Sequence, residues 1–497
     1  MLYLRMVVLM VANLYASRIV LAALGEDDYG LYSVVGGIVV FLGFINLSMT
    51  ASSQRFLAYS AGVGDKDAMS RMFNSVLAVH VLLGVVILAV GEACGLFYIY
   101  NYLNVEPGKI GLANIVFQFA LLSFVVKTVT VPYHASIIAN ERMHVFAWFS
   151  LIEGGLQLGC ALLIANIADD RLAVYSATMF GTVFTVQMCY RIYSSLKFKE
   201  CKFKRNWERK SIREIFAYSG WNLFGSFSAV CIDQGLNMVL NSFFGLAVNA
   251  ARAVAFQVSA AVGSLAGNLQ QAINPQIVKS YASHDKERNF SLIVNGTRLS
   301  FFLLAALALP IYFNLGSVLD IWLEEVPGYA LGFCRWIIVI SLLSAFSNSL
   351  ITGAMATGRI KRYQIIVASI NLCNIPLSIW LLHYFPDPYV TFYVMFGLGL
   401  AAFAARLIIS GSLLEFSRRE FMRRAVLPCL VAGVLAVAII GGLNMIIPSG
   451  GIWLTLLRLM LYFLITVAAV YAAGVNRSER KKINATVRDR VKPYFSR

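Results

Sequence analysis

The chain has 497 residues, of which 59% are hydrophobic and only 13% are charged, and its formal net charge is +16. That much apolar surface excludes a soluble protein of this size. Apolar runs of about 18 residues or more recur from end to end, and they are continuous, which excludes the alternating pattern of a membrane β-barrel. The sequence therefore predicts an all-α polytopic membrane protein.

The apolar runs predict about fourteen transmembrane helices. The first run is followed by further spans and lacks a clear small-residue cleavage site, so it is interpreted as a span and not as a signal peptide. In chain order the predicted spans lie roughly at 3–23, 31–54, 73–99, 112–138, 146–167, 172–194, 215–243, 249–274, 290–314, 331–355, 363–383, 389–413, 426–447 and 452–474.

Lys and Arg gather in the segments that follow the even-numbered spans. The clearest basic segments are 197–213, 358–362, 417–424 and 477–497, whereas the segments after the odd-numbered spans are acidic or neutral. The positive-inside rule therefore places both termini in the cytoplasm. We interpret the basic segments as topology signals that also touch anionic lipid headgroups, and not as a nucleic-acid site.

The sequence contains no spacing of cysteines, histidines or catalytic residues that is typical of disulfides, metal sites or catalytic centres. The eight cysteines lie mostly within spans and none forms a CxxC pair, so they are interpreted as free buried thiols. The histidines lack metal-ligand spacing, and the sequence has no P-loop and no nucleophile elbow. We expect a protein that is not an enzyme and that binds neither a metal nor another cofactor.

The stretch 231–285 is long enough for two membrane helices with a turn near Gly245, yet it carries many polar side chains. Lipid cannot satisfy such groups, so water or a buried ligand has to do so. Two polar faces, one on each helix, therefore predict a polar cavity inside a bundle. These faces consist of Asp233, Asn237 and Asn241 on the first helix, and of Gln257, Ser264, Asn268 and Gln271 on the second.

An internal repeat is visible at an offset of roughly 220 residues. Segment 54–76 resembles 275–297, and segment 137–154 resembles 354–371. Six spans per repeat preserve orientation, so we expect two parallel halves related by an axis along the membrane normal. The residues before the second copy of the first span have no counterpart after Met1, so a short lead-in is missing or the true start lies upstream.

The repeat divides the chain into predicted domains. They are an N-terminal six-helix lobe (1–194), a basic cytoplasmic linker (195–214), a C-terminal six-helix lobe (215–414), two additional transmembrane helices (415–474) and a basic cytoplasmic tail (475–497).

Six motifs carry a family resemblance that covers nearly the whole chain. They are LYASRIVLAALGEDDYGLYSVVGG (14–37), SSQRFLAY (52–59), PYHASIIANERM (132–143), VNAARAVAFQV (248–258), NPQIVKSYA (274–282) and ATGRIKRYQIIV (356–367). With these motifs the chain resembles the bacterial polysaccharide (O-antigen type, Wzx-like) flippases of the multidrug/oligosaccharidyl-lipid/polysaccharide exporter superfamily.

This resemblance implies two six-helix lobes around a central cavity, two added C-terminal helices and a place in the bacterial cytoplasmic membrane. It implies that the protein moves an undecaprenyl-diphosphate-linked oligosaccharide from the inner to the outer leaflet by alternating access, for surface polysaccharide biosynthesis such as that of lipopolysaccharide O-antigen. The implied partners are this lipid-linked glycan, membrane lipids, a polysaccharide polymerase and a chain-length regulator, and no nucleic acid.

Basic residues within the spans are the candidates for binding a diphosphate. One such residue at the centre of a lone helix costs about 2.5–3.5 kcal/mol, so it usually faces the bundle interior. We expect Arg18, Lys127, Arg252 and Arg298 to form a cationic cavity in which charge-assisted hydrogen bonds hold the diphosphate. The alternative is that these residues form fold-stabilising ion pairs, for example Arg252 with Asp233.

Amide side chains are the candidates for the sugars, and one acid is the candidate for coupling to a proton or sodium gradient. Asp233 is the candidate for coupling because its polar stripe continues along the same helix. The alternative is that Asp233 forms a structural ion pair or an interhelical hydrogen bond. The predicted sugar-binding residues are Asn237, Asn241, Gln257, Asn268 and Gln271.

Three other functions remain open. A multidrug exporter of the same superfamily would favour an acidic cavity, whereas this bundle has more internal bases than acids. A lipid II exporter would also have fourteen spans, and a non-transporting scaffold of a glycan assembly complex would need no cavity.

Overall fold

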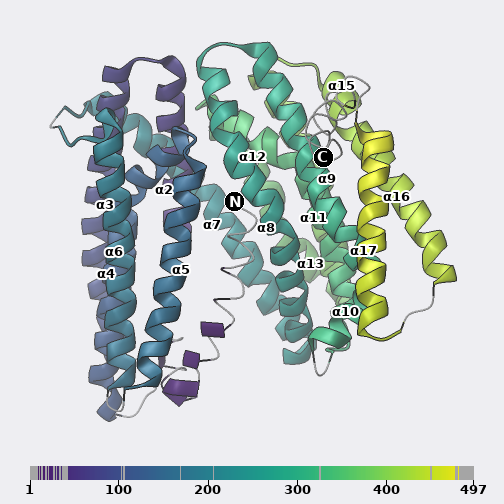
Figure 1. Cartoon of the computed structure of the whole chain (residues 1–497), viewed down its shortest axis with the longest axis horizontal. Helices are drawn as coiled ribbons and strands as arrows, with labels where there is room; N and C mark the ends of the chain where they lie inside the picture. The colour runs from purple at the N-terminus through teal and green to yellow at the C-terminus, as the bar shows by residue number, and fades with distance from the viewer. Residues whose placement is uncertain are drawn as a thin grey trace, which may run out of the picture. The chain divides into compact units, whose positions relative to one another are not determined.

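The computed structural model describes residues 43–101, 107–167, 170–204, 206–323, 326–447 and 450–475, together with Leu103, Arg480 and scattered positions before residue 36. Every regular element within this part of the chain is a helix (Figure 1). Eleven of its helical stretches are long and apolar enough to cross a membrane. The prediction of an all-α polytopic membrane protein is therefore confirmed.

The chain divides into two compact units. The first contains Met1–Phe227 and Val278–His284, and the second contains Ser228–Ile277 and Asp285–Arg497. The helices of the first unit are α2 (Gly43–Val63), α3 (Lys66–Asn101), η1 (Pro107–Lys109), α4 (Ile110–Ala139), α5 (Met143–Ala165), α6 (Arg171–Lys197) and η2 (Lys199–Cys201). α7 (Arg209–Phe244) and α8 (Leu246–Ala282) contribute to both units.

α4 is the central helix of the first unit, because it packs against α2, α3, α5 and α6. Its apolar residues lie all around the helix, as expected for a helix that is covered on several sides. Close packing against α3 depends on Gly95, where an added Cβ would lie 2.0 Å from Cζ of Phe117.

The predicted cytoplasmic linker is folded against the first unit. The Asn74 side chain of α3 accepts a hydrogen bond from the backbone N–H of Lys204 (2.8 Å), and the Ser75 hydroxyl accepts one from the N–H of Glu208 (3.1 Å). Cys201 of η2 is completely buried, and burial raises the pKa of its thiol to about 12. These contacts fix the path of the linker along α3.

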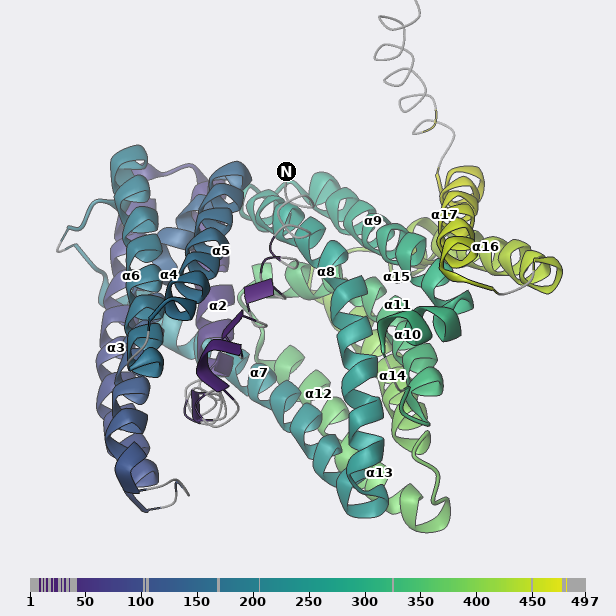
Figure 2. The same cartoon turned by 60° about the horizontal axis from the view of Figure 1, so that its bottom comes forward.

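In the second unit, α9 (Lys286–Phe313) has the central place and packs against α11, α16 and α17 (Figure 2). The other helices of this unit are α10 (Leu315–Trp322), α11 (Ala330–Ala356), α12 (Lys361–Leu372), α13 (Asn374–Tyr384), α14 (Val390–Leu413), α15 (Arg418–Phe421), η3 (Met422–Val426), α16 (Leu427–Ile446), α17 (Ile452–Ala469) and η4 (Val470–Gly474).

The predicted spans from 73–99 onward each coincide with described helices, and the local differences have physical causes. The span at 363–383 is two helices, α12 and α13, divided at Cys373 just before Pro376, whose ring cannot continue a regular helix. α10 is an additional short helix that buries Leu315 and Leu319. Cys94 on α3 and Cys373 at the junction of α12 and α13 are exposed, which corrects the expectation of buried thiols.

The internal repeat appears as matching turns. Gly64 and His284 both have positive φ values, of 83° and 58°, and each precedes an aspartate. Asp65 accepts backbone hydrogen bonds from Asp67 and Ala68, and Asp285 accepts one from Arg288. In the second repeated pair, Glu141 and Gly358 have φ values of 59° and 75°. The repeated sequence therefore encodes repeated helix ends and N-caps.

Candidate transport sites in the two helical units

The first candidate site is an ion pair between α4 and α5. The ammonium of Lys127 lies 3.6 Å from Oε1 of Glu153, and the two side chains are 41% and 24% exposed. This separation exceeds the 2.7–3.2 Å typical of an N–H···O hydrogen bond. The ammonium of Lys127 is therefore attracted electrostatically to Glu153 without a hydrogen bond to it. Its donors stay available to another anion.

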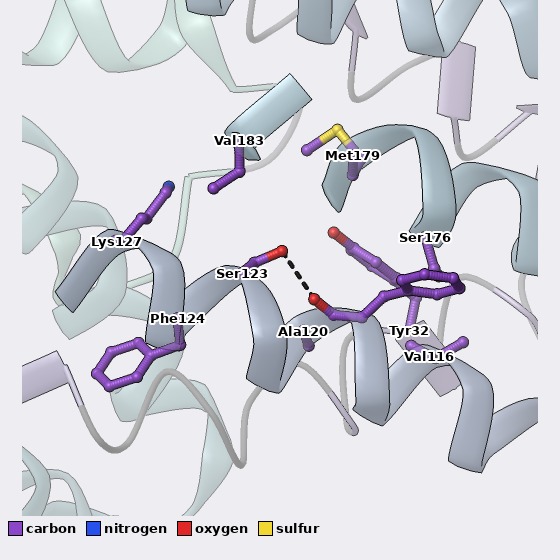
Figure 3. A pocket seen from close by; sticks show the side chains of 10 residues that line it. Tyr32, Val116, Ala120, Ser123, Phe124, Lys127, Ser176, Met179 and Val183 are labelled. Atoms are coloured by element: carbon purple, nitrogen blue, oxygen red, sulfur yellow. Dashed lines mark hydrogen bonds between the residues drawn. The ribbon is translucent and has the colours of Figure 1, made fainter. Parts of the chain in front are cut away.

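Lys127 also lines a pocket of about 260 Å³. The polar atoms of Lys127, Ser123 and Tyr32 point toward the same space, with Met179 and Val183 on its other side (Figure 3). The Ser123 hydroxyl donates a hydrogen bond to the carbonyl of Phe119. The pocket is smaller than the usual range of about 300–1,000 Å³ for drug-sized ligands, so it suits a small polar group or water.

The second candidate site is an ion pair between α7 and α8. Nη2 of Arg252 donates a 2.8 Å hydrogen bond to Asp233, and Nη1 bonds to the Asn237 side chain. The guanidinium also lies 4.2 Å from the centre of the Phe256 ring. Arg252 is only 5% exposed, whereas Asp233 is 43% exposed. The arginine is thus held from several sides, while the carboxylate keeps an open side.

Helix periodicity and one glycine bring these side chains together. Asp233 and Asn237 are one turn apart on α7, and Arg252 and Phe256 are one turn apart on α8, so each pair shares a helix face. Gly245 stands between the helices with φ of +80°, a conformation that L residues with side chains rarely adopt.

The other predicted diphosphate ligands are placed differently. Nη2 of Arg298 donates to the carbonyl of Gly474 in η4, and its guanidinium lies near the Phe302 ring. This contact joins α9 to the C-terminal helices, which is the environment of a packing residue. Arg18 lies outside the described residues. The structure therefore does not bring Arg298 to Arg252, and the role of Arg298 with a diphosphate stays a prediction.

The predicted sugar ligands also have different environments. Asn237 is engaged with Arg252, Gln257 is exposed on α8, Gln271 is half-buried and Asn268 is buried. The side chain of Asn241 lies outside the described part of the chain. Gln257 and Gln271 are therefore the members of the set that are open to a ligand.

The remaining arginines within the second unit contact neighbouring helices. Arg406 donates to the Ser347 hydroxyl, and Arg458 bonds to Asn444 on α16 and lies near the Tyr462 hydroxyl. Arg335 lies 5.9 Å from the centre of the Tyr312 ring. Among the described residues, no three His, Cys, Asp or Glu side chains are grouped as a metal site would require.

Sequence reasoning did not select Arg55 of α2. Its guanidinium lies 5.1 Å from the Tyr59 ring and 5.3 Å from the Tyr218 ring, and Tyr281 and Glu214 add to its surroundings. The available signal was its place in the SSQRFLAY motif, where an arginine is followed by aromatic residues one and four positions later.

The last turns of α8 belong to the first unit. Lys279 forms a 2.7 Å ion pair with Glu141 in the turn after α4, and the rings of Tyr281 and Tyr59 are 6.5 Å apart. Contact with α2 is so close that a Cβ at Gly62 would lie 2.7 Å from Cα of Lys279. We call these residues the α8 latch.

The fold that these units form is that of the MATE transporters of the MOP superfamily. The sequence matches no protein-family model. It also matches no curated protein. The comparison with solved structures therefore defines the class of fold, and it confirms the two-lobed architecture that the sequence predicted.

Three solved structures illustrate the similarity. A MATE in complex with MaL6 has a TM-score of 0.71 and 13% identity, and the match covers 83% of this chain and 94% of that one. An outward-facing multidrug resistance MATE family transporter has a TM-score of 0.72 and 12% identity, over 83% and 93%. A MOP superfamily transporter from Pyrococcus furiosus, described by the reverse polarity of its binding pocket, has a TM-score of 0.70 and 13% identity, over 84% and 95%.

Proposed function

We propose that this protein moves an anionic, polyprenyl-diphosphate-linked oligosaccharide across the bacterial cytoplasmic membrane. The observation that carries this proposal is the excess of basic over acidic side chains within the described membrane helices, with Lys127 half-exposed over a pocket. A cation in a membrane helix is costly unless it has an anionic partner. The MOP superfamily transporter from Pyrococcus furiosus supports the idea that this fold accommodates a pocket of different polarity.

In this proposal Lys127 is the main ligand of the diphosphate in the first unit. Its ammonium is a compact point charge with three donors, and its contact with Glu153 is too long to occupy them fully. Glu153 offsets the charge of Lys127 when the site is empty. A phosphate oxygen replaces Glu153 as the nearer partner during transport.

Arg252 and Asp233 couple transport to an ion in this proposal. Asp233 is half-exposed and holds Arg252 by a single strong hydrogen bond. Neutralisation of Asp233 by a proton weakens this bond, because a charge-assisted hydrogen bond is about twice as strong as a neutral one. Arg252 then gains a free donor for a phosphate. Loss of that proton restores the ion pair, so the phosphate loses this donor.

The amide side chains of α8 suit a glycan. Gln257 is exposed and Gln271 is half-buried on a helix that is otherwise largely apolar. Exposed amides in a membrane helix are stable only against water or a polar ligand. A sugar offers both donors and acceptors to an amide, which a hydrocarbon does not.

Alternating access requires contacts that form in one state and break in another. The α8 latch suits this role, since α8 begins in the second unit and its final turns pack in the first. The Lys279–Glu141 ion pair is partly exposed, so its loss costs little.

Reconstitution in proteoliposomes tests the proposed substrate. Protein in liposomes receives a labelled polyprenyl-diphosphate oligosaccharide or a cationic dye, and the transfer of each across the bilayer is followed. We expect transfer of the glycolipid, with at least about a tenfold loss for Lys127→Ala, as for one lost charge-assisted bond. Lys197→Ala, which removes a basic residue from the end of α6, serves as the control.

The same assay separates the alternatives. A multidrug exporter, whose fold is equally consistent with the solved structures, would move the dye and not the glycolipid. A lipid II exporter would move a labelled lipid II faster than the oligosaccharide, and a scaffold of a glycan assembly complex would move none of them. Each of these results would overturn the proposed substrate.

A further inference from the structure

A groove of about 760 Å³ lies on the first unit, apart from the ion pairs described above. Its walls come from α3, α4 and α6, and the linker residues Phe203 and Trp207 complete it. We call it the linker groove. It is lined by Leu77, Ala78, Val81, Leu82, Val85, Val125, Val126, Val129, Thr130, Tyr133, Met188, Arg191, Phe203 and Trp207. Its volume falls in the range of ligand sites.

The groove lies toward the end of the helices that carries the linker. The first turns of α3 and the last turns of α4 and α6 are at this end, because α6 leads directly into η2 and the linker. The linker holds much of the basic charge of the sequence, so the positive-inside rule puts this end at the cytoplasmic surface. The groove therefore opens to the inner leaflet.

The linker is fixed over the groove by specific bonds. Asn74 accepts a hydrogen bond from the backbone N–H of Lys204, directly after Phe203, and Ser75 accepts one from that of Glu208, directly after Trp207. The Asn74 amide also lies within 3.5 Å of the Lys202 carbonyl. Phe203 and Trp207 are thus held in place although both are exposed. An aromatic residue at the membrane interface is a typical contact for a lipid near its headgroup.

Apolar walls alone do not select a ligand in a membrane. A hydrocarbon chain leaves equally apolar surroundings when it enters such a groove, so the hydrophobic effect gives no net attraction. The groove has to distinguish one lipid from another at its polar end, where the lipid headgroup would lie. There Arg191 lines the groove together with Tyr133. The Thr130 hydroxyl donates a hydrogen bond to the Gln187 side chain. Arg191 is therefore the lining residue that can pair with an anion.

We propose that the linker groove binds an anionic lipid, with its phosphate at Arg191 and one hydrocarbon chain along Val81, Val85 and Val129. The phosphate pairs with the guanidinium, which offers several donors in a planar arrangement. The lipid is a bulk anionic phospholipid of the inner leaflet, onto which the groove opens. This inference needs only a membrane-embedded protein, so it stands apart from the proposed transport substrate.

Native mass spectrometry of the whole protein tests the groove. Detergent-solubilised protein is titrated with phosphatidylglycerol, with phosphatidylcholine as the zwitterionic reference. We expect preference for phosphatidylglycerol, and Arg191→Gln to reduce its binding about tenfold, as for one lost charge-assisted hydrogen bond. Lys197→Gln is the matched control, since it removes the same charge near the end of α6 outside the groove and leaves binding unchanged.

A second pair of variants tests the hydrocarbon path. Val81→Trp fills the groove from a position that is 45% exposed, and Val90→Trp puts the same ring at a 54% exposed site of α3 outside it. We expect only Val81→Trp to reduce lipid binding, with thermal unfolding temperatures of both variants near that of the wild type.

Competition identifies the source of the lipid. We expect undecaprenyl phosphate, added as a competitor, to leave the bound phosphatidylglycerol undiminished. Displacement of phosphatidylglycerol would identify a polyprenyl carrier as the ligand and overturn the assignment of a bulk phospholipid. Equal binding of phosphatidylcholine and phosphatidylglycerol, or unchanged binding in both Arg191→Gln and Val81→Trp, would overturn the proposal.

Discussion

Two ion pairs within the membrane helices each join one basic and one acidic residue, but they differ in residue type and in geometry. In the first unit, Lys127 and Glu153 are 3.6 Å apart and both are partly exposed. In the second unit, Arg252 is nearly buried and is bound by Asp233 at 2.8 Å, by Asn237 and by the Phe256 ring. The planar guanidinium can make several of these contacts at once, whereas an ammonium is a compact point charge.

The difference in contacts between Lys127 and Arg252 indicates which of the two charges is available to a ligand. A buried, fully contacted arginine stabilises its own surroundings, and its removal leaves a carboxylate without its partner. A loosely paired lysine contributes little to stability and retains donors. We therefore expect the arginine to matter chiefly for stability and for ion coupling, and the lysine to matter chiefly for the bound anion.

The largest expected effect is that of Arg252→Ala on stability. Breaking a buried ion pair costs about 3–5 kcal/mol, and the partial exposure of the Asp233 side chain moves our expectation to the lower end, about 3 kcal/mol. Thermal or denaturant unfolding in detergent measures this change. Arg252→Lys is the control, because it keeps the charge but loses the planar contacts. A destabilisation below about 1 kcal/mol, the range of exposed pairs, would contradict the contrast between the two sites.

A smaller effect is expected for the pair in the first unit. Lys127→Ala and Glu153→Gln should each lower the free energy of unfolding by less than Arg252→Ala does, since the 3.6 Å contact between Lys127 and Glu153 is too long for a hydrogen bond. The double variant should equal the sum of the two single variants within about 0.5 kcal/mol. The same unfolding measurements check both statements, and a coupling of several kcal/mol would show that Lys127 is as tightly held as Arg252.

The smallest effect concerns the repeated turns and depends on pH. Backbone hydrogen bonds from Ala68 and Asp67 lower the pKa of Asp65 in the folded protein. A lowered pKa stabilises the fold above the unfolded value of about 3.9, and this contribution is lost as the pH falls through the folded value. Asp65→Asn should therefore flatten the pH dependence of the unfolding temperature below about pH 4.

Glu415 is a second acid that behaves in this way, because the hydrogen bond from Lys286 lowers its pKa. Glu415→Gln therefore gives an independent comparison in the second unit. An unchanged pH profile in both variants would show that neither contact contributes to the acid side of stability.

Much of the fold was predictable because its determinants are local in the sequence. Apolar runs located the helices from α3 onward, and the repeat located the capped turns at Asp65 and Asp285. The interruption at Cys373 was harder to predict, because α12 and α13 together have the length and hydropathy of a single span. The folded path of the linker depends on Asn74, which is more than a hundred residues away in the chain.

The candidate site was predictable only in part. The sequence identified Lys127, Asp233 and Arg252 as charges in the membrane and offered an Arg252–Asp233 ion pair as an alternative, which the geometry of α7 and α8 contains. It could not show that Arg298 contacts Gly474, because α9 is packed on several sides and its sequence has no single polar face. It did not select Arg55 or Arg191 either, because their contacts with Tyr218 and with the lining of the groove come from distant segments.

The sequence by itself determined a helical membrane protein with a repeated architecture, because hydropathy, charge and turn residues act over a few positions along the chain. The tertiary structure alone decided which charges are paired, which are buried and which line a pocket, because these properties depend on the side chains that other helices bring within a few ångströms.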